Sequence, residues 1–235
     1  MAFKKMIKSW TYLLLWFFLV ACSSGGEKAA SNEEVGHSEH MDIPNITDLK
    51  ELGIDESTGI PSGLRVGDKA PGFGARDISG EPFDLYSVLN DNPVVLIFYR
   101  GKWCPVCNRH MAAISDSVNQ ISQLGARVIA VTPELREHAQ EFTNNTNLKF
   151  PVISDPGNNI MDAFKVTFKV TPEYEEKVAN SHAVRISENN GTGEAFLPVP
   201  ATYIIDKEGT ITYAQFDLNF YRRATVKEIV AALRP

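Results

Sequence analysis

The sequence predicts an α/β fold in which a mixed central sheet is flanked by helices. From about residue 64 to the C-terminus, strand-like and helix-like segments alternate, as in sheets that are built with helical crossovers. The run 93–99 is continuously apolar and rich in β-branched and aromatic residues, which is typical of a central parallel strand covered on both faces. Two further strand-like segments, 201–205 and 210–214, flank the turn sequence Asp-Lys-Glu-Gly, so a terminal hairpin makes the sheet mixed.

Local patterns predict the remaining elements. The longest is a helix from Cys107 to Gly125, because apolar residues recur in steps of four and three, at Met111, Ile114, Val118, Ile121 and Leu124. In chain order we expect a short helix at 46–59, an early strand or bend at 83–85, the central strand at 94–99, this long helix, a strand at 127–131, a helix at 134–143, an extended segment at 150–154, a short helix at 159–164, the hairpin, and a closing helix at 225–233.

A Cys-x-x-Cys pair, Cys104 and Cys107, stands directly after the central strand and at the first turn of the long helix. Pro105 suits the first helical position, where a missing N–H costs nothing. The free N–H groups and the dipole at a helix start favour a thiolate over a thiol. The pair also lies beyond the carboxyl end of the central strand, where such sheets place their chemistry. The sequence therefore predicts a redox site that cycles between dithiol and disulfide.

The N-terminus has the pattern of an export signal. Three lysines within the first eight residues precede the apolar run 12–21, which is too short for a spanning helix. The string Leu-Val-Ala-Cys that ends at Cys22 resembles the lipobox of bacterial lipoproteins, in which the cysteine is acylated and becomes the new N-terminus. An ordinary cleaved signal peptide and an uncleaved anchor are the alternatives. Ser23 favours the outer membrane if the host is a diderm bacterium, and the protein then faces the periplasm or the cell exterior.

These patterns divide the chain into a lipoprotein signal peptide (1–21), a polar disordered tether (22–45), a short N-terminal extension (46–63) and one domain (64–235) with an insertion at 165–198. The hydrophobic content of 43% is ample for one core, and the net charge is −6. No cluster of basic and aromatic residues is present, which excludes nucleic acid as an expected partner.

Five segments resemble one family, the peroxiredoxin-like branch of the thioredoxin superfamily, which is the alkyl hydroperoxide reductase and thiol-specific antioxidant group. They appear in the family's order and are 66–73, 95–107, 125–134, 150–155 and 200–206. The resemblance implies a thioredoxin-like fold from about residue 64 onward. It also implies thiol-based redox activity that needs no cofactor.

The chain departs from that family at residues that hold a peroxide. Members of that family have a motif similar to Pro-x-x-x-Thr-x-x-Cys after the central strand, and the cysteine of this motif, which attacks peroxide, corresponds to Cys107. Its proline is replaced here by Arg100 and its threonine by Cys104. A family arginine before the late strand is replaced by Pro200, at the position where thioredoxins have a cis-proline facing the dithiol. The resemblance thus implies a cis Pro200 beside the cysteines, and the alternative is an ordinary trans proline that enters a strand. Trp103 either covers the thiols as a flat surface for a partner, which we favour, or fills space beside the strand.

Two enzymatic hypotheses assign the cysteines different roles. In a disulfide oxidoreductase, the more exposed Cys104 attacks and Cys107 resolves the mixed disulfide. In a peroxidase, Cys107 is oxidised to sulfenic acid and Cys104 condenses with it. We favour the first, since the arginine and threonine that a peroxidase needs are replaced. The partner is then a protein thiol or disulfide, or a hydroperoxide. An external reductant such as a thioredoxin-type relay is required outside the cytosol.

Charges near the pair have two interpretations. Arg100, Lys102 and Arg109 either lower a thiolate pKa or are simply solvated at the helix start. A metal role is a third hypothesis, because Cys-x-x-Cys is half of a zinc site and His110 follows closely. The sequence has no second cysteine pair, and copper-delivery proteins of this fold resemble Cys-x-x-x-Cys instead. We therefore expect no metal.

The insertion 165–198 is the segment that the sequence explains least. A helix is expected to begin near Pro172, and the cluster 189–193 is rich in turn-forming residues. In a thioredoxin fold, a segment just before Pro200 lies close to the active site. The insertion then either binds substrate or reductant, or forms a hairpin that covers a sheet edge.

Overall fold

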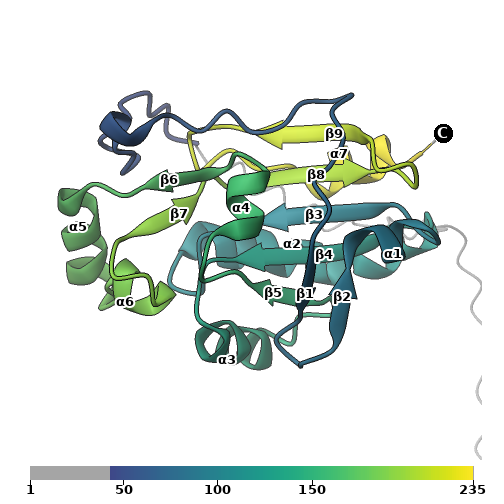
Figure 1. The fold of residues 1–235 in the computed structure, drawn as a ribbon, viewed down its shortest axis with the longest axis horizontal. Helices are drawn as coiled ribbons and strands as arrows, with labels where there is room; N and C mark the ends of the chain where they lie inside the picture. Colours follow the sequence, from purple (N-terminus) through teal and green to yellow (C-terminus); the bar gives the residue numbers. More distant parts are fainter. Residues whose placement is uncertain (1–42, 235) are drawn as a thin grey trace, which may run out of the picture. The chain divides into compact units, whose positions relative to one another are not determined.

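The computed structural model describes residues 43–234, and its central feature is a sheet with helices on both faces (Figure 1). Cys22, the expected signal peptide and nearly all of the expected tether lie outside the described residues. The elements in chain order are the 3-10 helix η1 (Glu56–Thr58), β1 (Gly74–Arg76), β2 (Pro82–Asp84), α1 (Leu85–Leu89), β3 (Val94–Phe98), α2 (Pro105–Gln123), β4 (Arg127–Thr132), α3 (Arg136–Thr146), β5 (Val152–Ser154), α4 (Asn159–Ala163), β6 (Thr167–Lys169), α5 (Pro172–His182), α6 (Ile186–Asn190), β7 (Phe196–Pro198), β8 (Ala201–Ile205), β9 (Ile211–Phe216) and α7 (Val226–Ala232).

The main sheet has the strand order β5-β4-β3-β8-β9. The three strands β3, β4 and β5 run parallel, while β8 and β9 join them as an antiparallel hairpin. Two small antiparallel sheets, β1-β2 and β6-β7, stand apart from it. The predicted α/β class with a mixed sheet is confirmed. Within the described residues, no helix has the length and apolar character needed to cross a bilayer.

Strand β3 is buried on both faces, as its continuous apolar run predicts. Because side chains alternate along a strand, Val95 and Ile97 belong to the core cluster that contains residues of α2 and α7. Val94, Leu96 and Phe98 belong to the opposite cluster, which contains residues of α1 and α4. Figure 1 shows α2 and α4 on opposite faces of the sheet. The strand is thus a rigid support for the residues that follow it.

Helix α2 begins where the sequence places it. Cys104 is the N-cap residue, with extended backbone and no side-chain cap, and Pro105 is the first helical residue. The predicted apolar stripe faces the core, and its members Met111, Ile114, Val118 and Ile121 are buried. The helix stops before Gly125, whose φ of +84° is the left-handed geometry that terminates helices. The cysteine pair is therefore fixed between a buried strand and a buried helix.

The prediction of a helix at 46–59 is wrong. The segment forms turns and the single turn of η1. The Asp48 carboxylate accepts the N–H of Lys50, which favours a turn over a helix. Gly53 has a φ of +83°, and a Cβ atom there would lie 2.5 Å from the Tyr174 ring. The segment is packed rather than helical, and Leu52 is buried within the main core.

The insertion forms a unit of its own at one end of the sheet. Strands β6 and β7 pair with each other, and α5 and α6 lie between them in the chain. The helix expected near Pro172 is confirmed, with Thr171 as its capping residue. The expected turn cluster is partly helical, because α6 extends to Asn190 and ends at the left-handed Gly191. In Figure 1 the unit lies beyond the end of β3 that leads to the cysteines.

Candidate active site

The two cysteines are in contact at the start of α2. Both are free and buried, and a hydrogen bond joins the Cys104 thiol to the sulfur of Cys107. The backbone brings them together because Cys104 is the N-cap and Cys107 lies in the first helical turn. The two sulfur atoms are hydrogen-bonding neighbours, which is the arrangement from which a disulfide can form.

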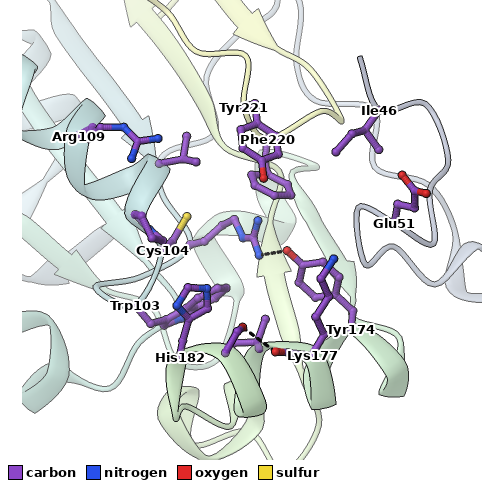
Figure 2. A pocket seen from close by; sticks show the side chains of 15 residues that line it. Ile46, Glu51, Trp103, Cys104, Arg109, Tyr174, Lys177, His182, Phe220 and Tyr221 are labelled. Atoms are coloured by element: carbon purple, nitrogen blue, oxygen red, sulfur yellow. Dashed lines mark hydrogen bonds between the residues drawn. The ribbon is translucent and has the colours of Figure 1, made fainter. Parts of the chain in front are cut away.

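Only one of the two sulfurs faces a pocket. Cys104 lines a pocket of about 310 Å³, whereas Cys107 is fully buried and does not belong to its lining. Figure 2 shows the sulfur of Cys104 pointing into this space. A molecule that enters the pocket therefore meets Cys104 before Cys107.

The negative charge of the reduced pair belongs on Cys107. Burial alone would raise the pKa of Cys107, but the hydrogen bond from Cys104 and the charges of Arg223 and Arg100 hold it well below its usual range. The Nη2 of Arg223 lies 3.5 Å from the sulfur of Cys107. The same hydrogen bond and burial raise the pKa of Cys104 well above its usual value. Cys104 is thus the proton donor of the pair, and Cys107 is the thiolate.

Arg100 is not a solvated charge but a buried one, with 1% of its surface exposed. Its guanidinium carbon lies 4.1 Å from the ring centre of Phe220, 4.8 Å from that of Trp103 and 5.3 Å from that of Tyr174. Its Nη2 donates a hydrogen bond of 2.7 Å to the Tyr174 hydroxyl. Three aromatic faces thus stabilise the cation. Within residues 43–234 it forms no ion pair with a carboxylate.

The other two cations near the motif lie on the surface. The Lys102 ammonium pairs with the exposed carboxylate of Glu141 on α3. Arg109 is exposed on α2 and lines the rim of the pocket. The cations that act on the cysteine thiols are instead Arg100 and Arg223.

Trp103 lies where the sequence predicts, next to the cysteines in the lining of the pocket. It is 8% exposed, and its ring centre lies 6.0 Å from that of His182 on α5. Its indole joins the motif to the insertion. Trp103 therefore bounds the space into which Cys104 points.

The prediction of a cis peptide bond before Pro200 is wrong. Every peptide bond of the described residues is trans, including the one that precedes Pro200. The Val199 N–H donates to the carbonyl of Val166, so the chain enters β8 already held in an extended path. A trans X-Pro bond is favoured by about 0.5–1 kcal/mol when no contact selects the cis form. Pro200 is buried at the same end of the sheet as the cysteines, but it does not line the pocket.

Two residues near the site escaped the sequence analysis. Arg223 comes from the loop between β9 and α7, and no local pattern marks it. Glu134 precedes α3 and is fully buried. Its carboxylate accepts the N–H of Lys102 at 2.9 Å and the side-chain amide of Asn189 at 3.0 Å. Burial raises the pKa of Glu134 to about 7. The only signal for it was a carboxylate directly after a buried strand.

His110, the residue considered as a metal ligand, is turned toward α7. Its Nε2 lies 2.9 Å from the carbonyl oxygen of Ala224. Burial and the charge of Arg223 lower the pKa of His110 to about 4, so the ring is neutral. The described residues contain no group of three His, Cys, Asp or Glu side chains placed to hold a metal ion.

A mixed sheet whose central strand leads into a Cys-x-x-Cys pair at a helix start defines the thioredoxin-fold class of proteins. The chain belongs to the AhpC/TSA family, whose model matches residues 66–214. Similar curated proteins include the chloroplastic peroxiredoxin Q of Triticum aestivum, 29% identical over 158 residues, which are 67% of this chain and 62% of the relative. The thiol-disulfide oxidoreductase ResA of Halalkalibacterium halodurans is 33% identical over 105 residues, which are 43% of this chain and 57% of the relative.

Solved structures support the same fold. The peroxidoxin BcpB of Mycobacterium tuberculosis superposes with a TM-score of 0.56 at 18% identity, covering 72% of this chain and 96% of that one. The peroxiredoxin Q of Xanthomonas campestris gives a TM-score of 0.52 at 16% identity, covering 68% of this chain and 89% of that one. The thioredoxin-like fold of peroxiredoxins is thereby confirmed. The chain spans less than two thirds of the length of the wheat and Halalkalibacterium relatives.

Proposed function

We propose that this protein is an extracytoplasmic thiol–disulfide oxidoreductase of the peroxiredoxin-like type, in which Cys104 and Cys107 cycle between dithiol and disulfide. The observation that carries the proposal is that the two sulfur atoms differ in position and in charge. Cys104 faces the pocket, and the thiolate of Cys107 lies directly behind it. A sulfur that faces a pocket and is bonded to a good leaving thiolate suits attack by a substrate thiolate on the disulfide.

Exchange starts when the oxidised protein meets a thiol. The substrate thiolate attacks the sulfur of Cys104 in the disulfide, a mixed disulfide forms, and Cys107 leaves as a thiolate. A second substrate thiolate then attacks the substrate sulfur of the mixed disulfide, and Cys104 is released and takes a proton. The substrate has lost two electrons, and the protein has gained them as a dithiol. The opposite direction uses the same steps reversed, with Cys104 as the attacking sulfur.

Charge at the site sets the direction that is favoured. Arg223 and Arg100 stabilise the thiolate of Cys107, which exists only in the reduced protein. Stabilising the reduced form raises the reduction potential of the pair. A low-pKa thiol is also the better leaving group, so Cys107 departs readily when Cys104 is attacked. We therefore infer that the disulfide form is a competent oxidant of thiols.

The experiment that tests this proposal is trapping of the mixed disulfide. In Cys107→Ser the Cys104 thiol remains at the pocket but nothing resolves the intermediate, so a protein or small-molecule disulfide is expected to accumulate on Cys104. Cys104→Ser is the matched control, because it leaves only the buried sulfur. Accumulation on Cys107 but not on Cys104 would contradict the assigned roles.

Peroxidase activity is a second candidate, and one specific contact favours it. Arg223 lies 3.5 Å from the Cys107 sulfur and its buried Nη1 has no hydrogen-bond partner, so that nitrogen is available to a peroxide oxygen. In this reaction Cys107 would attack a hydroperoxide, releasing an alcohol and forming sulfenic acid. Cys104 would then condense with it, releasing water and forming the same disulfide.

Peroxide consumption separates the two candidates. A peroxidase requires Cys107 alone for the first step, so Cys104→Ser should still consume one equivalent of hydroperoxide and Cys107→Ser should consume none. An exchanger without peroxidase activity shows no fast consumption in either variant. Formation of a Cys107 sulfenic acid in Cys104→Ser, detected by mass after dimedone trapping, would make the peroxidase the better description.

Location outside the cytosol is part of the proposal and is supported by the N-terminal sequence pattern. We infer that Cys22 is acylated and holds the domain at a membrane surface, facing the periplasm or the cell exterior, where a thioredoxin-type relay supplies electrons. Incorporation of labelled palmitate into the wild-type protein, and its loss in Cys22→Ala together with release from the membrane fraction, is the expected result. Unchanged labelling of Cys22→Ala would exclude the anchor.

A further inference from the structure

The pocket in front of Cys104 is unusual in its charge. Its lining holds the cations Arg100, Arg109 and Lys177 and a single carboxylate, Glu51, in a protein whose net charge is −6. The rest of the lining is largely aromatic or aliphatic. A mostly apolar pocket with a few placed polar groups is the usual form of a ligand site. The excess of positive charge therefore indicates what kind of group enters it.

Arg100 is the buried cation in the lining of this pocket. It is 1% exposed, and its guanidinium donates a hydrogen bond to the neutral hydroxyl of Tyr174. Its Nε is buried and has no partner. Burying a guanidinium is costly unless its donors and its charge are satisfied. Aromatic faces compensate part of the charge, but the open donor remains.

Helix α5 of the insertion supplies the wall opposite the cysteines. Tyr174 and Val178 are buried on it, and Lys177 and His182 reach the pocket from the same side. Figure 2 shows Tyr174 and Lys177 across the pocket from Cys104, and His182 beside Trp103. The insertion thus places an aromatic hydroxyl and a cation, Tyr174 and Lys177, in the lining of the pocket that Cys104 faces.

The redox state changes the charge around Arg100. In the dithiol, the thiolate of Cys107 is a negative neighbour of Arg100. When the Cys104–Cys107 disulfide forms, that negative charge is lost, and Arg100 is left buried with no anion. An anionic group entering the pocket would restore the balance, and the returning thiolate would weaken its binding.

We propose that this pocket binds the carboxylate of a thiol substrate, with Arg100 as the buried cation that receives it and the oxidised protein as the form that binds best. The inference rests on the proposed thiol–disulfide exchange. It adds the substrate class: carboxylate-bearing thiols, which the oxidised protein binds, converts and then releases when it becomes reduced. The pocket volume of about 310 Å³ suits a small acid or one acidic side chain.

The test compares three small thiols as reductants of the oxidised full-length protein. They are 3-mercaptopropionate (anionic), 2-mercaptoethanol (neutral) and cysteamine (cationic). For each thiol, the rate at which it reduces the protein is divided by the rate at which it reduces a reference small disulfide at the same pH. Trp103 fluorescence reports the reduction. The expected normalised order is anionic, neutral, cationic, with about tenfold between the first two, as a charge-assisted contact gives. Equal normalised rates would overturn the inference.

Substitutions locate the effect. Arg100→Met should reduce the anionic preference to about one, while Arg100→Lys should keep part of it because the charge remains. Lys207→Met is the matched control, since Lys207 is an exposed cation in the β8–β9 turn at the other end of the sheet. The preference of this variant for the anionic thiol should equal that of the wild type. A preference that survives in Arg100→Met would contradict the role of Arg100.

A measurement on the unmodified protein keeps the inference testable if Arg100→Met does not fold. Propionate, but not propionamide, should slow the reduction by 2-mercaptoethanol and lower the reduction potential, by about 30 mV for a tenfold preference for the oxidised form. A short peptide thiol with glutamate beside cysteine, compared with its glutamine counterpart, distinguishes an acidic peptide from a small acid. If no thiol reduces the protein, the proposed exchange fails. If all reduce it and propionate has no effect, only the anion site fails.

Discussion

The Nη2 of Arg223 lies 3.5 Å from the sulfur of Cys107, although 116 positions separate them in the chain. The loop that carries Arg223 is held from two sides. The Arg223 Nε donates to the carbonyl of Phe220 at 2.5 Å, and the Ala224 carbonyl contacts His110 on α2. This contact helps to lower the pKa of Cys107, together with the hydrogen bond from Cys104, and it is the basis of the first prediction.

Replacing Arg223 by methionine is expected to raise the pKa of Cys107. The substitution keeps the length and apolar packing of the side chain but removes the positive charge beside the thiolate, so the pKa of Cys107 should rise toward its usual range. Ultraviolet thiolate absorbance as a function of pH, in a Cys104→Ser background, measures it. Arg222→Met is the control, because Arg222 is exposed and pairs with Asp217 instead. Equal titration of both variants would show that Arg223 does not stabilise the thiolate.

A second prediction concerns how the Arg223 loop is positioned. Asn219 is 2% exposed, its Nδ2 donates to the carbonyl of Pro44 at 2.7 Å and its Oδ1 accepts the N–H of Tyr221 at 3.2 Å. Asn219→Ala removes both bonds and should cost about 1–2 kcal/mol in the free energy of unfolding. Because the loop loosens, the pKa of Cys107 should rise as well. Urea unfolding and thiolate titration measure the two effects.

Asn219→Asp separates the two bonds. Aspartate keeps the acceptor for Tyr221 but loses the donor to Pro44 and adds a buried negative charge, so at neutral pH Asn219→Asp should lose at least as much stability as Asn219→Ala. At low pH its protonated carboxyl can donate to the Pro44 carbonyl, and the loss should then be smaller than that of Asn219→Ala. A Cys107 pKa that stays at the wild-type value in both variants would mean that the N-terminal extension does not help to position Arg223.

The sequence predicted the elements whose signals are local and missed the contacts that are not. Strand β3 and helix α2 follow from a dense apolar run and a regular stripe, so they were located within a few residues. Arg223 reaches the site through chain topology, which no local pattern encodes. The sequence left two interpretations of Arg100, a solvated charge or a charge that lowers a thiolate pKa. It could not decide between them because the burial of Arg100 depends on Tyr174, a residue of the insertion. The cis assignment of Pro200 rested on family resemblance, and the local chain path decided otherwise.

A third prediction is a pH-dependent loss of stability caused by Glu134. Its pKa is about 7 in the folded protein and 4.5 for a free side chain, because burial disfavours the carboxylate. Below pH 4.5 the carboxyl is neutral in both states, so its full contribution to stability is present. As the pH rises from 4.5 through 7 the unfolded chain ionises first, and the free energy of unfolding falls.

Glu134→Gln should abolish this dependence while keeping an amide oxygen for the Lys102 N–H. Urea unfolding at a series of pH values between 5 and 8 measures it, as the difference between the wild type and the variant. Glu137→Gln is the control, since Glu137 is an exposed carboxylate in helix α3, which follows Glu134. If the two variants lose stability with pH in parallel, Glu134 is not the group that titrates.

A fourth prediction links the N-terminal extension to the wall of the pocket. Gly53 and Gly59 both have positive φ, +83° and +108°, so alanine strains the backbone at either position. They differ in space: a Cβ at Gly53 would lie 2.5 Å from the Tyr174 ring, whereas nothing lies within 4 Å at Gly59. Gly53→Ala must therefore displace the Tyr174 ring, whose hydroxyl accepts the hydrogen bond of Arg100.

The expected result is that Gly53→Ala lowers the free energy of unfolding by about 1–3 kcal/mol more than Gly59→Ala does, which is the usual range for overpacking a buried site. Because Tyr174 also contacts Arg100, only Gly53→Ala should change the rate at which Cys104 reacts with a small disulfide. Urea unfolding and stopped-flow kinetics of both variants measure these effects. Equal stabilities and equal rates would mean that the extension adjusts without moving Tyr174, and that the pocket wall does not depend on this contact.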